Sequence, residues 1–246
     1  ERDALESRGV WKTVRELPRG AKLLKAKIVY KQKRNQHGEI VRFKCRCTAK
    51  GYSQIEFVNF YDTFAAVASG SYVRTCLSLA TANRMRIRHL DVVTAFLYPR
   101  LKEKMYMLVP EDIAAYPGEI VELFHSIYGT RQAAHNWYKE LIAALRAFGM
   151  QPAVDEETVF VTTVKGRKLI VVMFVDDIIV IHNDDQLFKR FLKHLQSKFE
   201  ITDEGDLQWY LGVYYQRSAD GATMTASQAS YIDRLATTFG GERWQP

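Results

Sequence analysis

The chain has 246 residues, of which 47% are hydrophobic and 26% charged, and its formal net charge is +7. This composition is typical of a folded globular protein and excludes the disordered, collagen-like and disulfide-scaffold classes. Apolar runs stay shorter than the roughly 18 residues of a membrane helix, so we expect no membrane partner. The first residue is Glu1 rather than Met, which leads us to expect an excerpt from a longer polypeptide.

The positive charge is concentrated near the N-terminus. Residues 1–60 hold 15 Lys and Arg against 6 Asp and Glu, whereas the other 186 residues hold 20 against 22. A basic region beside a mildly acidic remainder predicts that a polyanion binds at one end of the protein, although a solubilising basic tail is the alternative. The three cysteines, Cys45, Cys47 and Cys76, have no zinc-site spacing, so we expect reduced thiols in an intracellular protein.

The first clear elements are two strands at residues 27–34 and 40–50, around the turn-rich tip Asn35-Gln36-His37-Gly38. Alternation of side chains gives this ribbon two faces. The apolar face holds Ile28, Tyr30, Phe43, Cys45 and Cys47. The other face holds Val29 and five cations, Lys31, Lys33, Arg42, Lys44 and Arg46. Because five like charges on one face repel each other, the pattern predicts an anionic partner; a solvated strand face is the alternative.

The remaining elements alternate between helix and strand periods. Helices are predicted at 71–85, with Ser71 as the cap, at 130–148, with Thr130 as the cap, at 185–199 and at 227–239. Strands are predicted at 87–93, 160–164, 169–175, 178–181 and 208–217. Residues 203–206 are predicted to form a loop, and Asp184-Asp185 to cap a helix. Antiparallel strands joined by long helices give an α+β fold.

Residues 169–181 carry the most informative pattern. Eleven of the thirteen are apolar, and the other two are the adjacent carboxylates Asp176 and Asp177. The run is long enough that its centre must turn, but Asp-Asp is not a favoured two-residue hairpin turn. Neighbouring carboxylates in apolar surroundings repel each other and lose solvation, and a divalent cation such as Mg²⁺ or Mn²⁺ relieves both costs. A solvated turn is the competing interpretation.

A third carboxylate, Asp91, lies in a similar apolar, strand-forming segment. Three strand-borne carboxylates can hold two divalent metals, of which one activates the attacking oxygen and the other carries the phosphates and the leaving group. Phosphoryl transfer needs this arrangement because its barrier falls mainly through positioning and charge neutralisation.

An ordered series of motifs runs through nearly the whole chain. The matching segments are Trp11-Lys12-Thr13-Val14, Phe43-Lys44-Cys45-Arg46, Ala49-Lys50-Gly51-Tyr52-Ser53-Gln54, Tyr61-Asp62-Thr63-Phe64, Val67-Ala68, Leu90-Asp91-Val92, Ala95-Phe96-Leu97, Ser126-Ile127-Tyr128-Gly129, Gln132-Ala133, Trp137, Phe174-Val175-Asp176-Asp177-Ile178, Gly205-Asp206-Leu207 and Tyr210-Leu211-Gly212. In this order they resemble the reverse transcriptase domain of copia-type (Pseudoviridae-like) long-terminal-repeat retrotransposon polyproteins. Each motif alone is weak, whereas the ordered set is specific.

The resemblance implies a fold and an activity. The fold would be the fingers and palm of a right-hand polymerase, with fingers at 1–66 and 99–132, palm at 67–98 and 133–217, and the start of a thumb at 218–246. The activity would be addition of deoxynucleoside triphosphates to a primer 3′ end on an RNA or DNA template, with two Mg²⁺ or Mn²⁺ ions. The setting would be intracellular, in a cytoplasmic virus-like particle or the nucleus; the oligomeric state stays open.

The resemblance also implies roles for individual residues. Asp91, Asp176 and Asp177 would be catalytic and would bind metal, and Val92 would lend its backbone carbonyl. The nucleotide-binding residues would be Arg46, Lys44, Phe96, Tyr128, Gly129 and Gln132, with Phe96 crowding the sugar 2′ position. The nucleic-acid-binding residues would be Lys31, Lys33, Arg42, Lys50, Trp209, Tyr210, Leu211 and Gly212, the last four in the primer grip. Strand packing is the alternative for Trp209 and Tyr210, and a core position is the alternative for Phe96.

The sequence departs from the family pattern at several places. The departures are Cys47-Thr48, Ala65-Ala66, Tyr98-Pro99 and Ala134. None removes a carboxylate, but together they favour a diverged copy. A catalytically decayed or host-adopted copy that only binds nucleic acid is therefore the competing function, and an unrelated α+β phosphohydrolase with a similar metal site is a third.

Overall fold

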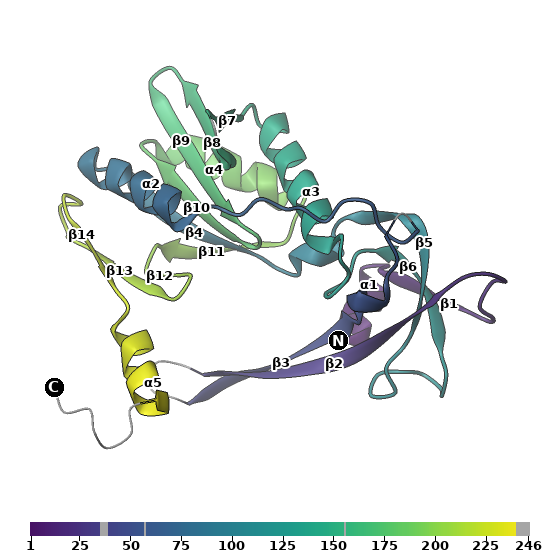
Figure 1. Ribbon diagram of the computed structural model, residues 1–246. Coiled ribbons are helices and arrows are strands. Elements are labelled where there is room, and N and C mark those ends of the chain that lie inside the picture. Colours follow the sequence, from purple (N-terminus) through teal and green to yellow (C-terminus); the bar gives the residue numbers. More distant parts are fainter. Residues whose placement is uncertain (35–38, 57, 155, 240–246) are drawn as a thin grey trace. The chain divides into compact units, whose positions relative to one another are not determined.

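The computed structural model describes residues 1–34, 39–56, 58–154 and 156–239, with Lys33, Arg34 and Val41 described by their backbone alone (Figure 1). The chain divides into two compact units. Unit 1 comprises Glu1–Ala66 and Thr94–Ala144, and unit 2 comprises Val67–Val93 and Leu145–Pro246. Both are built mostly from sheets with some helices, which confirms the predicted mixture of helices and strands. The described strands pair antiparallel except in unit 1, where residues 23–25 pair in parallel with residues 106–108.

Unit 1 is organised around a five-stranded sheet with the order β1-β6-β5-β2-β3. Its elements are α1 (Arg2–Ser7), β1 (Trp11–Val14), β2 (Leu23–Arg34), β3 (Ile40–Ala49), η1 (Gly51–Ser53), η2 (Ala95–Leu97), β5 (Arg100–Leu108), β6 (Ile120–His125) and the larger part of α3 (Ala133–Ala147). The core lies against this sheet and includes Leu5, Trp11, Leu24, Cys47, Met107, Val121 and Leu123. Burial of these apolar side chains is the main stabilising contribution.

The β2–β3 ribbon grows out of this sheet. Residues 23–25 of β2 pair in parallel with β5, and residues 26–34 pair antiparallel with β3 alone. The two predicted strands are therefore confirmed, while the predicted tip at residues 35–38 lies outside the described residues. Cys47 is buried at the base of the apolar face, but Tyr30 and Phe43 farther along it are 69% and 72% exposed.

Unit 2 contains a six-stranded antiparallel sheet, β11-β4-β10-β9-β8-β7, and a small sheet, β12-β13-β14. Its elements are α2 (Gly70–Ala82), β4 (Arg86–Val92), β7 (Gln151–Ala153), β8 (Glu156–Val164), β9 (Arg167–Phe174), β10 (Asp177–His182), α4 (Asp185–Gln196), β11 (Ile201–Asp206), β12 (Trp209–Tyr210), β13 (Val213–Arg217), β14 (Met224–Ser227) and α5 (Ala229–Phe239). No helix among the described residues is long and apolar enough to cross a membrane.

Helices cover the six-stranded sheet on both faces (Figure 1). On one face, Val73 and Leu77 of α2 join the cluster that contains Ile87 and Ile179. On the other face, the ring of His182 stacks on Phe188 of α4, with 4.7 Å between ring centroids. Since both faces are covered, β9 and β10 are almost wholly apolar instead of alternating, as the sequence shows.

Two of the predicted helix caps are wrong. Ser69 caps α2, because its hydroxyl oxygen accepts a hydrogen bond from the Tyr72 amide at 3.4 Å, so Ser71 is not the cap. Thr130 does not cap α3, because its hydroxyl donates to the Ile127 carbonyl at 2.9 Å and the helix begins at Ala133. The predicted cap of α4 is confirmed, since the Asp184 carboxylate accepts from the Leu187 amide at 2.7 Å.

Two further predictions about the region after α4 are wrong. Residues 203–206 belong to strand β11, which pairs with β4 and is bulged between Asp203 and Gly205. Edge pairing with β4 overrides the turn tendency of Gly205. The predicted strand 208–217 is broken at Leu211 and Gly212, where both residues have positive φ (49° and 80°) and β12 turns back into β13.

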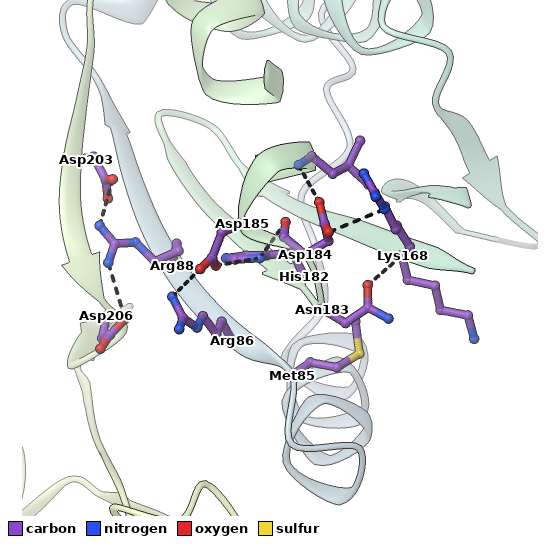
Figure 2. Close-up of polar contacts among 12 residues, drawn as sticks. Met85, Arg86, Arg88, Lys168, His182, Asn183, Asp184, Asp185, Asp203 and Asp206 are labelled. Atoms are coloured by element: carbon purple, nitrogen blue, oxygen red, sulfur yellow. Dashed lines mark hydrogen bonds and ion pairs between the residues drawn. The ribbon is translucent and has the colours of Figure 1, made fainter. Parts of the chain in front are cut away.

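Charged side chains fasten the end of the sheet away from the β9–β10 turn (Figure 2). Arg88 of β4 donates to Asp203 at 2.7 Å and to Asp206 at 3.4 Å, which ties the bulged edge strand to its neighbour. Arg86 pairs with Asp185 at 2.8 Å, and Asn183 accepts from the Lys168 amide at 2.7 Å. The acidic residues that follow β10 therefore have structural partners at this end of unit 2.

The β9–β10 hairpin turns through Val175 and Asp176, because Phe174 pairs with Asp177. Val175 has φ +55°, a left-handed conformation that a β-branched residue adopts only at a cost of about 1–2 kcal/mol. We therefore predict that Val175→Gly keeps the free energy of unfolding within about 1 kcal/mol of the parent protein, because relief of strain offsets the lost side chain.

The matched control for this turn is Val172→Gly in β9. Val172 is fully buried in ordinary strand conformation, so the same substitution there should cost about 3 kcal/mol in urea unfolding. Equal costs at the two positions would contradict strain at Val175.

A buried carboxylate, Glu119, holds the N-terminal helix of unit 1. It accepts hydrogen bonds from Arg2 at 2.7 Å, from the Thr13 hydroxyl at 2.9 Å and from the Ala115 amide at 2.7 Å. Its hydrogen bond with Arg2 is the main cause that lowers its pKa to about 2. A lowered pKa in the folded state adds stability above the unfolded pKa, and this contribution is lost as the pH falls toward 2.

We predict that the free energy of unfolding of the parent protein falls between pH 4.5 and pH 2, and that Glu119→Gln flattens this fall. At pH 7, Glu119→Gln should cost about 3 kcal/mol, because it removes the buried one of the two carboxylates that pair with Arg2 and leaves only the exposed Glu6. Urea unfolding at several pH values measures both effects, with the exposed Glu111→Gln as the control. An unchanged pH profile in Glu119→Gln would rule out this linkage.

Candidate functional site

The first part of the site is the pairing of β4 with β10. In their antiparallel register Asp91 lies directly opposite Asp177. Alternation along both strands places these two side chains on the same face of the sheet, and residues directly opposite each other have Cβ atoms about 4.5–5.5 Å apart. Two carboxylates that are 86 positions apart in the sequence thus meet on adjacent strands.

The third predicted carboxylate, Asp176, lies in the turn immediately before β10. Its backbone carbonyl accepts a hydrogen bond from the Val92 amide at 3.0 Å, so the turn is fixed to the end of β4. Asp91, Val92, Asp176 and Asp177 therefore come together at one end of the two strands, within unit 2. All three carboxylates are partly accessible.

A histidine that the sequence assigned only to the strand contacts this group. His89 Nε2 lies 3.0 Å from Asp177 Oδ1, and its ring meets Tyr210 edge to face, with centroids 5.9 Å apart and an interplanar angle of 88°. One signal in the sequence could have revealed this contact: His89 lies two positions before Asp91, and that spacing places both side chains on one face of β4.

Tyr210, a predicted primer-grip residue, has a buried side chain. It is 3% exposed, and its hydroxyl has no hydrogen-bond partner among the described residues. Burial raises the pKa of Tyr210, and the negative charge of Asp177 raises it further. Its neighbours in the β12–β13 hairpin are open to solvent, since Trp209 is 46% and Leu211 is 42% exposed. Gly212 completes the turn of this hairpin.

The residues present fit a divalent metal by their chemistry. Carboxylate oxygens are the ligands that Mg²⁺ and Mn²⁺ prefer. Val92, whose backbone carbonyl is the further predicted ligand, is joined to the Asp176 turn through its amide. The described residues contain no group of three or more His, Cys, Asp or Glu side chains that could by itself hold an ion. Mg²⁺ sites commonly use one or two carboxylates and complete the coordination with water or substrate phosphates, so a protein site with few ligands still suits this ion.

Three of the predicted nucleotide-binding residues meet in unit 1. The Arg46 guanidinium lies over the Tyr128 ring, 4.8 Å from its centroid, and Tyr128 meets Phe96 edge to face at 5.5 Å. Arg46 Nε is buried and has no hydrogen-bond partner among the described residues. The stacking fixes the plane of a guanidinium, which suits bidentate binding of a phosphate.

Two other predicted nucleotide-binding residues have structural roles. Gly129 has φ +84°, and a Cβ there would lie 2.2 Å from the Ala49 carbonyl oxygen, so only glycine fits. The Gln132 side chain is buried. Its oxygen accepts a hydrogen bond from the side-chain amide of Gln54 at 2.9 Å, and its nitrogen donates to the Asn59 backbone carbonyl at 3.0 Å. Their binding roles stay predictions.

The predicted basic face of the ribbon carries cations directly across from each other. The register pairs Lys31 with Lys44 and Lys33 with Arg42. Like charges on paired strand positions are destabilising unless an anion lies between or above them. Lys31 and Arg42 are exposed, Lys44 and Lys50 are partly buried, and the side chain of Lys33 lies outside the described residues.

Comparison with known proteins identifies the family. Residues 8–241 match the family model described as "Reverse transcriptase (RNA-dependent DNA polymerase)". The chain is 30% identical over 249 residues to the "Retrovirus-related Pol polyprotein from transposon TNT 1-94" of Nicotiana tabacum, which covers 100% of this chain and 19% of the polyprotein. It is 32% identical over 232 residues to the corresponding polyprotein from transposon RE2 of Arabidopsis thaliana, covering 93% and 16%.

A yeast relative is similar over a shorter stretch. The "Transposon Ty1-DR1 Gag-Pol polyprotein" of Saccharomyces cerevisiae is 29% identical over 187 residues, covering 71% of this chain and 10% of that polyprotein. The chain thus spans less than a fifth of the length of these relatives. The resemblance to copia-type proteins is confirmed, and the chain belongs to the reverse transcriptase (RNA-dependent DNA polymerase) family.

Proposed function

We propose that the chain is the catalytic part of an RNA-directed DNA polymerase, which adds deoxynucleotides to a primer 3′ end on an RNA or DNA template. The observation that carries the proposal is the register of β4 and β10, which sets Asp91 opposite Asp177 and fixes the Asp176 turn beside Val92. The family membership supports the same chemistry. In this proposal the enzyme works inside the cell, in a virus-like particle or the nucleus.

The proposal assigns polymerase subdomains to segments of the chain. Residues 1–66 and 99–132 form the fingers, residues 67–98 and 133–217 the palm, and residues 218–246 the start of a thumb. The six-stranded sheet of unit 2 is then the palm sheet, and the β12–β13 turn is the primer grip. Exposed Trp209 and Leu211 contact the primer, and buried Tyr210 supports the turn from below.

The residues of the chain divide the chemical work. Asp91, Asp176 and Asp177, with the Val92 carbonyl, would hold two Mg²⁺ or Mn²⁺ ions. When bound, the ions neutralise phosphate charge and make the primer 3′ oxygen a better nucleophile. Arg46, steadied by Tyr128, binds the triphosphate and stabilises the charge that develops as pyrophosphate leaves.

Other side chains select and hold the substrates. Phe96 packs at the sugar 2′ position and favours deoxynucleotides. Its edge-to-face contact with Tyr128 holds the Phe96 ring in place for this role. Lys31, Lys33 and Arg42 of the ribbon bind backbone phosphates of the template and primer. Because these contacts release counterions, binding weakens steeply as salt rises.

A non-catalytic copy that only binds nucleic acid is the second candidate. The departures from the family pattern, such as Cys47-Thr48 and Tyr98-Pro99, favour it. Metal-dependent primer extension separates the two functions, because only the polymerase requires the three carboxylates to act together. A phosphohydrolase would instead cleave its substrate without a primer.

We predict that Asp176→Asn lowers primer extension by at least a factor of about 100, because one charge that holds the metals is lost. Binding of a labelled primer–template should stay within about threefold of the parent protein. The matched control is Asp184→Asn, which removes a carboxylate used as a helix cap and should keep normal extension. Equal extension by Asp176→Asn and the parent protein would refute the catalytic assignment.

We also predict that the ribbon cations set the salt dependence of binding. Arg42→Ala should weaken primer–template binding and reduce the slope of log affinity against log salt by about 1, because one phosphate contact is lost. Fluorescence anisotropy between 50 and 300 mM salt measures the slope. Lys189 is an exposed cation on α4, and Lys189→Ala is the control that should leave the slope unchanged. If Arg42→Ala gives the same slope as this control, the ribbon does not belong to the binding surface.

A further inference from the structure

The contact between His89 and Asp177 has no role in the function proposed above. His89 belongs to β4 and lies opposite Ile179 of β10, so its side chain is on the same sheet face as Asp91 and diagonal to Asp177. Its Nε2 is 3.0 Å from Asp177 Oδ1, and both side chains are partly buried, at 15% and 32% exposed. Partial burial makes such a hydrogen bond stronger than one in open water.

The direction of this hydrogen bond follows from chemistry. An ionised carboxylate only accepts, so the imidazole Nε2 must carry the hydrogen and donate it. This holds for the neutral Nε2–H tautomer and for the imidazolium alike. The arrangement therefore does not depend on the charge of His89.

The imidazole is held from a second side. The Tyr210 ring meets the His89 ring edge to face, and Tyr210 is itself a buried residue of the β12–β13 hairpin. A side chain that is packed on one side and hydrogen-bonded on the other keeps one rotamer. His89 thus offers Asp177 a donor whose position is fixed before any ligand arrives.

We propose that His89 is a positioning residue for the metal-binding carboxylate Asp177. Its Nε2–H occupies one acceptor position on Oδ1 and fixes the orientation of the carboxyl group, so that Oδ2 stays available to a cation. The inference rests on the proposed function, since it assumes that Asp177 is a metal ligand. Hydrogen bonds from surrounding residues that orient ligands change metal affinity by about 10- to 100-fold when they are removed.

Direct metal binding tests the proposal without any turnover. Mn²⁺ is titrated into the 246-residue chain and its free concentration is followed by electron paramagnetic resonance, for the parent protein, His89→Leu and His89→Gln. We expect His89→Leu to weaken Mn²⁺ binding about tenfold. His89→Gln should restore it to within about threefold, because its amide Nε2–H can donate from a similar position.

Controls separate positioning from a loss of fold. His194→Leu, a histidine of α4 in the same unit, should bind Mn²⁺ like the parent protein. Thermal unfolding of each variant shows whether it is folded. Parent-like affinity in a folded His89→Leu overturns the proposal, and so does an equal loss in His89→Leu and His89→Gln, since the donor would then be irrelevant.

A second measurement applies even where His89→Leu does not fold. The ¹⁵N signals of His89 should show a hydrogen on Nε2 in the parent protein, and Asp177→Ala should shift that signal. Nε2 without hydrogen, or no shift in Asp177→Ala, overturns the hydrogen bond and with it the proposal. If instead the signals behave as expected but the parent protein binds no Mn²⁺, then the metal site of the proposed function fails, and the positioning role fails with it.

Discussion

The antiparallel pairing of β4 with β10 is the constraint on which the site depends. Asp91 and Asp177 come from segments far apart in the sequence, and only this register sets them opposite each other on one face. A slip of one residue would move one carboxylate to the other face, where α4 packs. The apolar residues of both strands fix the register, because Leu90, Ile178 and Ile179 must be buried on the correct sides.

Several features near the three carboxylates lower the stability of the fold. A valine in left-handed conformation lies in the β9–β10 turn, and two carboxylates face each other across paired strands. The buried hydroxyl of Tyr210 has no hydrogen-bond partner within the described part of the chain. Strain and unpaired polar groups of this kind gather at functional sites because the surrounding core over-determines the fold. In unit 2 that core is the two-sided packing of α2 and α4 on the sheet.

The sequence alone predicted the strongly periodic elements. Strands β2, β3, β4, β9 and β10 and helices α2, α3, α4 and α5 lie where periodicity placed them, apart from a few residues at their ends. The edge strand β11 was missed because its residues are polar and include Gly205, and its pairing with β4 depends on tertiary contacts with Arg88. The contact of His89 with Asp177 was missed for a similar reason, since the two residues lie on different strands. The predicted binding roles of Gln132 and Tyr210 could not be weighed against burial, which no local pattern in the sequence reveals.

The proposed polymerase activity requires that Asp91, Asp176 and Asp177 jointly hold divalent metal while a nucleotide is bound. A crystal structure of the chain with primer–template, a deoxynucleoside triphosphate and Mn²⁺, with anomalous scattering recorded at the manganese edge, tests this claim most directly. The account predicts manganese peaks in contact with carboxylate oxygens of Asp91 and Asp176 and with the triphosphate. Manganese bound to the triphosphate alone, with Asp91 and Asp176 out of contact, would contradict it.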